Sequence, residues 1–129
     1  MPEQYLYEYA LIRVVPRVER EEFINVGVVL YCPKKKWLCA KIQIDADRLK
    51  SLYPQTDVEL VGAHVTAISK ICAASKPGEG GPIGQLDLAS RFRWLTAMRS
   101  TIIQTSRVHP GFTVDPEETL KRLFNTMVL

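Results

Sequence analysis

The segment from Arg13 to Leu30 constrains the fold more than any other part of the chain. It reads RVVPRVEREEFINVGVVL, in which a short charged connection after Pro16 joins two apolar runs. Proline ends a strand because it cannot donate to the ladder. The second run opens with Asn25 and Gly27, although neither residue type favours a strand. Such a break in local consistency marks special backbone geometry or a site.

The apolar patterns around this segment predict a three-strand antiparallel meander. Residues 5–15 are rich in aromatic and β-branched side chains, residues 25–32 are apolar on both faces, and residues 37–44 alternate cleanly. These patterns are typical of an outer strand, a central strand and a second outer strand. Across the turn between the last two strands we expect Cys32 opposite Trp37 and Cys39 opposite Leu30, with free thiols on one face.

The rest of the chain reads mainly as helix. Aspartates at helix starts and apolar spacings of three and four predict helices at 45–52, 57–74, 87–95 and from Asp115 onward. Residues 76–85 read as a flexible glycine-rich loop, residues 101–107 as a fourth strand, and His109-Pro110-Gly111 as a turn. The last helix should turn four side chains inward: Leu120, Leu123, Phe124 and Met127. The predicted fold is α+β, an antiparallel sheet of about four strands with helices packed on one face.

Composition narrows the class of protein. A chain of 129 residues with 47% hydrophobic and 24% charged residues is expected to fold as one domain, residues 1–129. The net charge of +3 only weakly favours a nucleic-acid partner. Three cysteines without a CxxC pair predict no disulfide framework, metal site or cofactor. Without a membrane-length apolar run or a secretory signal, we expect a cytoplasmic protein.

Two long stretches carry a family resemblance: YEYALIRVVPRVEREEFINVGVVLYCPKKKWL near the start and GGPIGQLDLASRFRWLTAMRSTIIQTSRVHPGFTVDPEETLKRLF near the end. Together they resemble the bacterial family catalogued as domain of unknown function 3037. The resemblance covers essentially the whole chain, less clearly the helix at 57–74. It implies a small cytoplasmic bacterial protein without an established activity, cofactor or catalytic residue. Because members of that family are often encoded beside a kinase-like protein related to the persistence toxin kinases, it also implies a protein partner.

The first candidate site consists of Arg13, Glu22 and Asn25, which gather at one end of the sheet if the first two strands pair. An arginine fork can hold a carboxylate or a phosphate, and the other two side chains can position water or a ligand amide. The alternative is structural: Glu22 pairs with Arg13 or caps the connection, and Asn25 makes a local turn bond. Gly27 either permits a bulge or lies beneath a neighbouring side chain.

The second candidate set runs through the late strand: Arg99, Ser100, Gln104, Ser106 and His109. A serine and a histidine can act as nucleophile and base. However, no Gly-x-Ser-x-Gly motif surrounds either serine, and a histidine in a turn is commonly exposed or bonded as a cap. Catalysis is therefore the weaker interpretation of this set.

Several other features favour structural interpretations. The glycine loop lacks the preceding strand and the Lys-Ser/Thr of a phosphate-binding loop. His64 and Cys72 share a helix face but are too few ligands for a structural metal site. Basic residues beside aromatic ones can bind nucleic acid, although a solvated helix face or turn is the commoner explanation. These basic residues are Lys34, Lys35, Lys36, Arg91, Arg93 and Arg99, the last three near Phe92 and Trp94.

The outer face of the predicted sheet is more apolar than a free surface needs, because it carries Tyr7, Tyr9, Leu11 and Trp37. Exposed apolar patches mark partner or homodimer contacts, and a covering helix is the alternative. We therefore expect a non-enzymatic protein-binding or accessory module. One alternative is a small hydrolase or nuclease-like enzyme, and another is a nucleic-acid binder that uses the arginines around Trp94. The enzyme would use Arg13, Glu22, Asn25 and His109.

Overall fold

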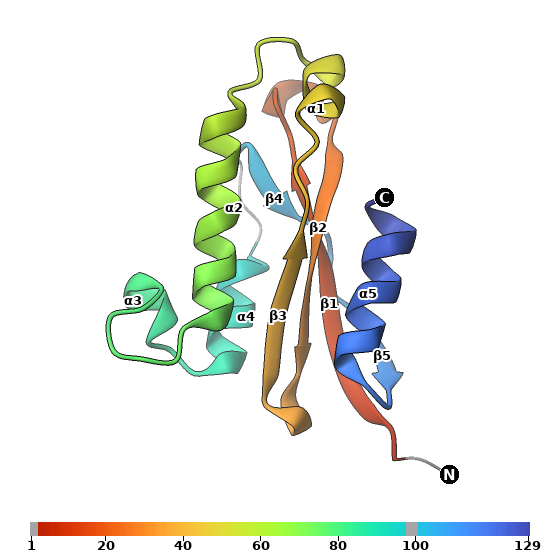
Figure 1. The fold of residues 1–129 in the computed structure, drawn as a ribbon, viewed down its shortest axis with the longest axis vertical. Coiled ribbons are helices and arrows are strands. Elements are labelled where there is room, and N and C mark those ends of the chain that lie inside the picture. Colours follow the sequence, from red (N-terminus) through yellow and green to blue (C-terminus); the bar gives the residue numbers. More distant parts are fainter. Residues whose placement is uncertain (1–2, 98–100) are drawn as a thin grey trace.

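A computed structural model describes residues 3–97 and 101–129, which form a five-stranded antiparallel sheet flanked by helices (Figure 1). The strands are β1 (Tyr5–Val14), β2 (Ile24–Cys32), β3 (Trp37–Ile42), β4 (Ile103–Thr105) and β5 (His109–Thr113). The helices are α1 (Ala46–Leu52), α2 (Val58–Ala73), α3 (Gly81–Gly84), α4 (Leu88–Leu95) and α5 (Pro116–Met127). Two short 3-10 turns, η1 (Val18–Arg20) and η2 (Pro33–Lys35), connect the first three strands.

The strand order confirms the predicted meander. The sheet runs β3-β2-β1-β4, so β2 lies between β1 and β3. The predicted register is also confirmed, with Cys32 opposite Trp37 and Cys39 opposite Leu30, and the cysteines are free thiols. The other edge of β1 is shared, because β4 pairs with its last residues and β5 with its first half.

A bulge in β2 lies beside Gly27 and sets which side chains meet. Ile12 is opposite Gly27, but the next residue of β1, Arg13, is opposite Asn25, which leaves Val26 as the extra residue. An extra residue reverses the alternation of side chains beyond it. Asn25 therefore lies on the same face of the sheet as Arg13. Gly27 also lies beneath a neighbour, because a Cβ there would come within 2.8 Å of Ile42 Cγ1.

The α+β class is confirmed, but the helices do not all pack on one face. α2 and α4 lie against one face of the sheet, and α5 lies against the other (Figure 1). The reason is visible in β2, where Val29 and Tyr31 enter the core under α2 and α4 while Val28 and Leu30 enter the core under α5. A strand that is apolar on both sides needs cover on both sides.

The predicted helix starts are confirmed by their caps. The carboxylates of Asp45, Asp57, Asp87 and Asp115 each accept a backbone N–H of the first turn. The bond from Ser90 N–H lowers the pKa of Asp87. The loop at 76–85 contains a helical turn, α3, which packs against α2. Within the described residues, no helix combines the length and apolarity that crossing a bilayer requires.

β5 corrects one prediction, because His109-Pro110-Gly111 belongs to a strand and not to a turn. The pairing with β1 overrides the local turn signal, and Pro110 is tolerated because β5 is an edge strand. Gly111 lies under the Tyr7 ring, since a Cβ at this position would be 2.4 Å from that ring. One helix position also differs, because Met127 is 39% exposed whereas Leu120, Leu123 and Phe124 are buried as predicted.

Candidate functional site

Three polar side chains form a row across β2, β1 and β4 at the end of the sheet. Arg13 is opposite Asn25 on β2 and opposite Gln104 on β4. Directly opposed residues of antiparallel strands carry neighbouring side chains on one face. Two members of the first predicted set, Arg13 and Asn25, are therefore brought together, and Gln104 from the second set joins them.

Phe23 holds the guanidinium of Arg13 in place. The Arg13 Cζ lies 4.1 Å from the centroid of the Phe23 ring. Phe23 is 45% exposed, so the ring covers the guanidinium from the solvent side. The Arg13 Nε is buried and has no hydrogen-bond partner among the residues that the structure describes. A buried donor without a partner is uncommon in a folded protein, because it loses its hydration without compensation.

Asn25 joins the row to the end of α5. Its Nδ2 donates to the carbonyl of Met127 at 3.3 Å, and Arg48 Nη1 donates to the carbonyl of Val128 at 3.1 Å. These two donors satisfy carbonyls that a helix leaves open at its C-terminus. The Asn25 Oδ1, in contrast, is buried and has no hydrogen-bond partner within residues 3–97 and 101–129. The amide therefore has a structural role on one side and an unused acceptor on the other.

A cleft of about 880 Å³ opens beside the row, between the η1 connection and the stretch that contains β4. Its lining mixes charged, polar and apolar side chains. The residues are Arg13, Val15, Val18, Glu21, Phe23, Thr96, Gln104, Thr105, Ser106, Arg107 and Val108. One wall is thus a continuous stretch of chain, residues 104–108. We call this feature the β4 cleft.

β4, whose residues Gln104 and Thr105 line the cleft, is an edge strand. The Ser106 N–H donates to the Leu11 carbonyl and the Val15 N–H donates to the Ile102 carbonyl. The pairs Leu11–Ser106 and Val15–Ile102 are therefore hydrogen-bonded pairs between β1 and the chain that contains β4. Since bonded and non-bonded pairs alternate, Thr105 points its N–H and C=O away from β1. The Thr105 Oγ1 is buried and also lacks a hydrogen-bond partner. Among the described residues, the polar groups of Thr105 that face away from β1 are thus unused.

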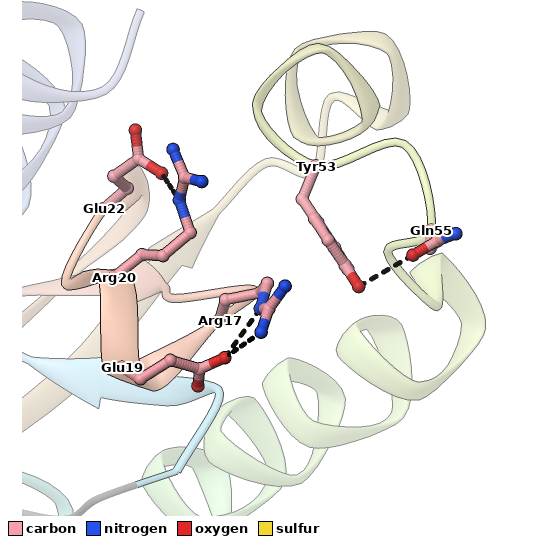
Figure 2. Close-up of polar contacts among 6 residues, drawn as sticks. All are labelled: Arg17, Glu19, Arg20, Glu22, Tyr53 and Gln55. Atoms are coloured by element: carbon pink, nitrogen blue, oxygen red, sulfur yellow. Dashed lines mark hydrogen bonds and ion pairs between the residues drawn. The ribbon is translucent and has the colours of Figure 1, made fainter.

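Glu22 does not join the row. Figure 2 shows that it binds Arg20 within the η1 connection, while Glu19 binds Arg17. Both pairs are exposed. The bond from Glu22 raises the pKa of Arg20. A guanidinium two residues away is a nearer partner for Glu22 than Arg13 on the strand, which explains why the expected pair of Glu22 with Arg13 is not found.

Ser106 lines the β4 cleft together with Arg13 but its hydroxyl is bonded within the fold, whereas His109 lies apart from Arg13. The Ser106 Oγ accepts the Leu11 N–H at 2.8 Å and donates to the Arg107 carbonyl at 2.9 Å, so the hydroxyl stabilises the end of β4. His109 is opposite Tyr9, and the two rings are 5.4 Å apart. Tyr9 lies four residues before Arg13 on β1, which is about 13 Å of strand. The predicted catalytic candidates do not form one cluster.

The face on which a partner or homodimer contact was expected is covered by α5. Tyr7 is only 6% exposed, and Tyr9, Leu11 and Trp37 pack against the same core. The α5 side chains in this core include Leu120, Leu123 and Phe124. The covering helix, which was the alternative to a docking surface, is therefore the arrangement found.

The remaining sequence candidates take structural positions where the structure describes them. Arg91 donates to the Ala74 carbonyl at the end of α2, Arg93 forms a bidentate pair with Glu8, and Phe92 is fully buried. Arg99 and Ser100 lie outside the described residues. Cys72 is buried and His64 is exposed on α2. In the described part of the chain, no three His, Cys, Asp or Glu side chains gather as metal ligands.

Sequence reasoning named Arg13, Gln104 and Ser106 but missed the other residues of the cleft lining, among them Phe23, Thr105 and Arg107. Phe23 carried a usable signal, because it lies two residues before Asn25 and is therefore a diagonal neighbour of Arg13 once the strands pair. Thr105 and Arg107 carried none, since their role depends on which edge of β1 the late strand joins.

Comparison with family models gives a single assignment for the chain. Residues 9–128 match the family model described as Protein of unknown function (DUF3037). Comparisons with curated proteins and with solved structures found no match. The matched range begins within β1 and includes the other four strands completely. It also includes every residue that lines the β4 cleft. The chain therefore belongs to the DUF3037 family.

Proposed function

We propose that this protein is a non-enzymatic binding module and that the β4 cleft docks a segment of a partner protein. The observation that carries the proposal is the cleft itself, which is lined beside an apolar rim by Arg13 and Thr105, two residues that each have a buried side-chain atom without a hydrogen-bond partner within the described residues. Polar groups that lack partners within the fold are the groups that a ligand satisfies.

The shape of the cleft favours a peptide segment as ligand. Residues 104–108 form one wall as a continuous stretch, and Thr105 presents its N–H and C=O on the free edge. An extended segment can pair with such an edge through its backbone and place alternate side chains in neighbouring pockets. Val15, Val18 and Val108 supply the apolar contacts.

The hydrolase alternative has less support. Arg13 and Asn25 are adjacent, but Glu22 is bound to Arg20 and His109 is opposite Tyr9. A general base must reach the group from which it takes a proton. The kinase-like neighbour that the family resemblance implies is a candidate partner under the proposal.

The test is peptide selection against the full-length chain with a blocked cleft as counter-target. Val18→Trp fills the cleft from the η1 connection, and Lys34→Trp adds the same side chain at the distant hairpin turn η2. Peptides selected from a random library should bind wild type and Lys34→Trp equally and bind Val18→Trp at least about tenfold more weakly. Peptides that bind all three proteins equally would overturn the proposal, and so would the absence of any selected peptide.

A further inference from the structure

The guanidinium of Arg13 lines the β4 cleft without an anionic partner. Within the described residues, ion pairs engage Arg17, Arg20 and Arg93 but not Arg13. We propose, on the basis of the proposed function, that the segment docked in the cleft is acidic and that Arg13 binds a side-chain carboxylate of its Asp or Glu. This assigns a ligand chemistry and a recognition residue to the site.

The fold holds Arg13 in a fixed position for this contact. The Phe23 ring stacks on the guanidinium, and Asn25 and Gln104 flank it from the two neighbouring strands. The bulge at Val26 is what brings Asn25 to this face. Stacking leaves the edge of a guanidinium free, and that planar edge matches a carboxylate with two parallel N–H donors. The Arg13 side chain is thus already ordered in the free protein, so that binding loses less conformational entropy.

Two acids of the η1 connection, Glu19 and Glu22, do not neutralise Arg13. Glu19 and Glu22 are bound to Arg17 and Arg20, as Figure 2 shows, so the η1 connection compensates its own charges. Arg107, a second guanidinium in the lining, is exposed and forms no ion pair within the described residues. The lining therefore attracts a negatively charged segment.

The amount of charge favours a carboxylate over a phosphate. The lining contains two arginines, Arg13 and Arg107, and one acid, Glu21. Its net charge of one positive unit matches a carboxylate, whereas a phosphate monoester carries nearly two negative charges at neutral pH. The described lining includes no N-terminus of an α-helix, which is the usual source of additional donors for phosphate.

The experiment measures binding of matched fluorescent peptides to the full-length chain by polarisation. One peptide alternates Glu with Val, the second replaces each Glu with Gln, and the third replaces one Glu with phosphoserine. The Glu peptide should bind wild type at least about tenfold more tightly than the Gln peptide, because a charge-assisted bidentate contact is lost. Arg13→Gln should abolish that preference, and Lys34→Gln, with the same charge change at the η2 turn, should retain it.

A second measurement does not depend on a variant that must fold. The Arg13 Nε–H resonance of wild type, assigned from its absence in Arg13→Lys, should shift when the Glu peptide is added and should not shift with the Gln peptide. Equal binding of the Glu and Gln peptides, or an unshifted Nε–H at saturation, overturns the inference. If the phosphoserine peptide binds more tightly than the Glu peptide and this binding requires Arg13, the recognised group is a phosphate and the inference of a carboxylate is wrong. Uncharged peptides whose binding requires the cleft, and which bind Arg13→Gln as tightly as wild type, would contradict this inference. The proposed function would still hold in that case.

Discussion

The α5-facing side of β1 differs between its two ends. Tyr7 and Leu11 lie in a continuous core beneath α5. Arg13, on the same face beyond the end of α5, has a buried Nε without a partner and lines a cleft. One end is built as the interior of a stable fold. The other retains groups that nothing in the described fold satisfies, which is the pattern expected where a site is kept at the expense of stability.

The largest expected effect tests the packed end. Phe124 is 3% exposed and lies in the core under α5. Phe124→Ala should lower the free energy of unfolding by about 3–5 kcal/mol, because it leaves a cavity that the core cannot fill. Phe23→Ala at the open end should cost less than about 1 kcal/mol, since exposed side chains contribute little. Chemical denaturation measures both, and equal losses would remove the distinction between the two ends.

A smaller effect tests how closely β5 is fitted to the packed end. Gly111→Ala places a Cβ 2.4 Å from the Tyr7 ring. We expect a loss of about 1–3 kcal/mol in the free energy of unfolding, because the ring must move in a filled core. The matched control is Gly62→Ala in α2, where a Cβ meets nothing within 4 Å. That change should stabilise the protein by about 0.5–1 kcal/mol, as alanine favours a helix. A tolerated Gly111→Ala would show that the Tyr7 ring is loosely packed.

The smallest expected effect tests whether water is excluded from the core on the other face of the sheet, under α2. Burial raises the pKa of the Cys72 thiol to about 12, and burial likewise raises the pKa of the half-buried Cys39. Above the ordinary thiol pKa of about 8.5, the unfolded chain loses the Cys72 proton while the folded chain keeps it. Stability should therefore fall as pH rises, by about 1 kcal/mol per pH unit from this group.

The readout for Cys72 is the difference between wild type and Cys72→Ala in unfolding free energy from pH 8 to pH 10. That difference isolates the thiol from tyrosines and lysines that titrate in the same range. Identical pH slopes for the two proteins would mean that water reaches the Cys72 side chain, so that the core under α2 is not dry.

Much of the fold could be predicted because its determinants are local. Apolar patterns gave β1, β2 and β3 and the register of β2 against β3, and aspartate caps gave the starts of the four longer helices. β5 was not predictable, because the turn signal of Pro110 and Gly111 is overridden by pairing with β1 and by the Tyr7 ring. The face under α5 was expected to bind a partner, because apolar residues on an outer strand give the same sequence pattern whether a helix or a partner covers them.

The candidate site was predictable only in part. Pairing of the first two strands brought Arg13 and Asn25 together as expected. Glu22 bound Arg20 instead, Ser106 became part of the strand ladder, and His109 lies opposite Tyr9. Each of these outcomes depends on competition between near and distant partners, which sequence spacing does not rank.

The sequence by itself determined the first three strands, the starts of the four longer helices, and that β2 is buried on both sides, because hydrophobic period and capping chemistry act over a few residues. Only the tertiary structure decided the rest. The bulge at Val26 determines which face Asn25 lies on, the shared edge of β1 places Thr105 and Arg107 near Arg13, and the end of α5 meets the row at Asn25. These are relations between segments distant along the chain, and the packing of all of them together fixes which polar groups remain unpaired.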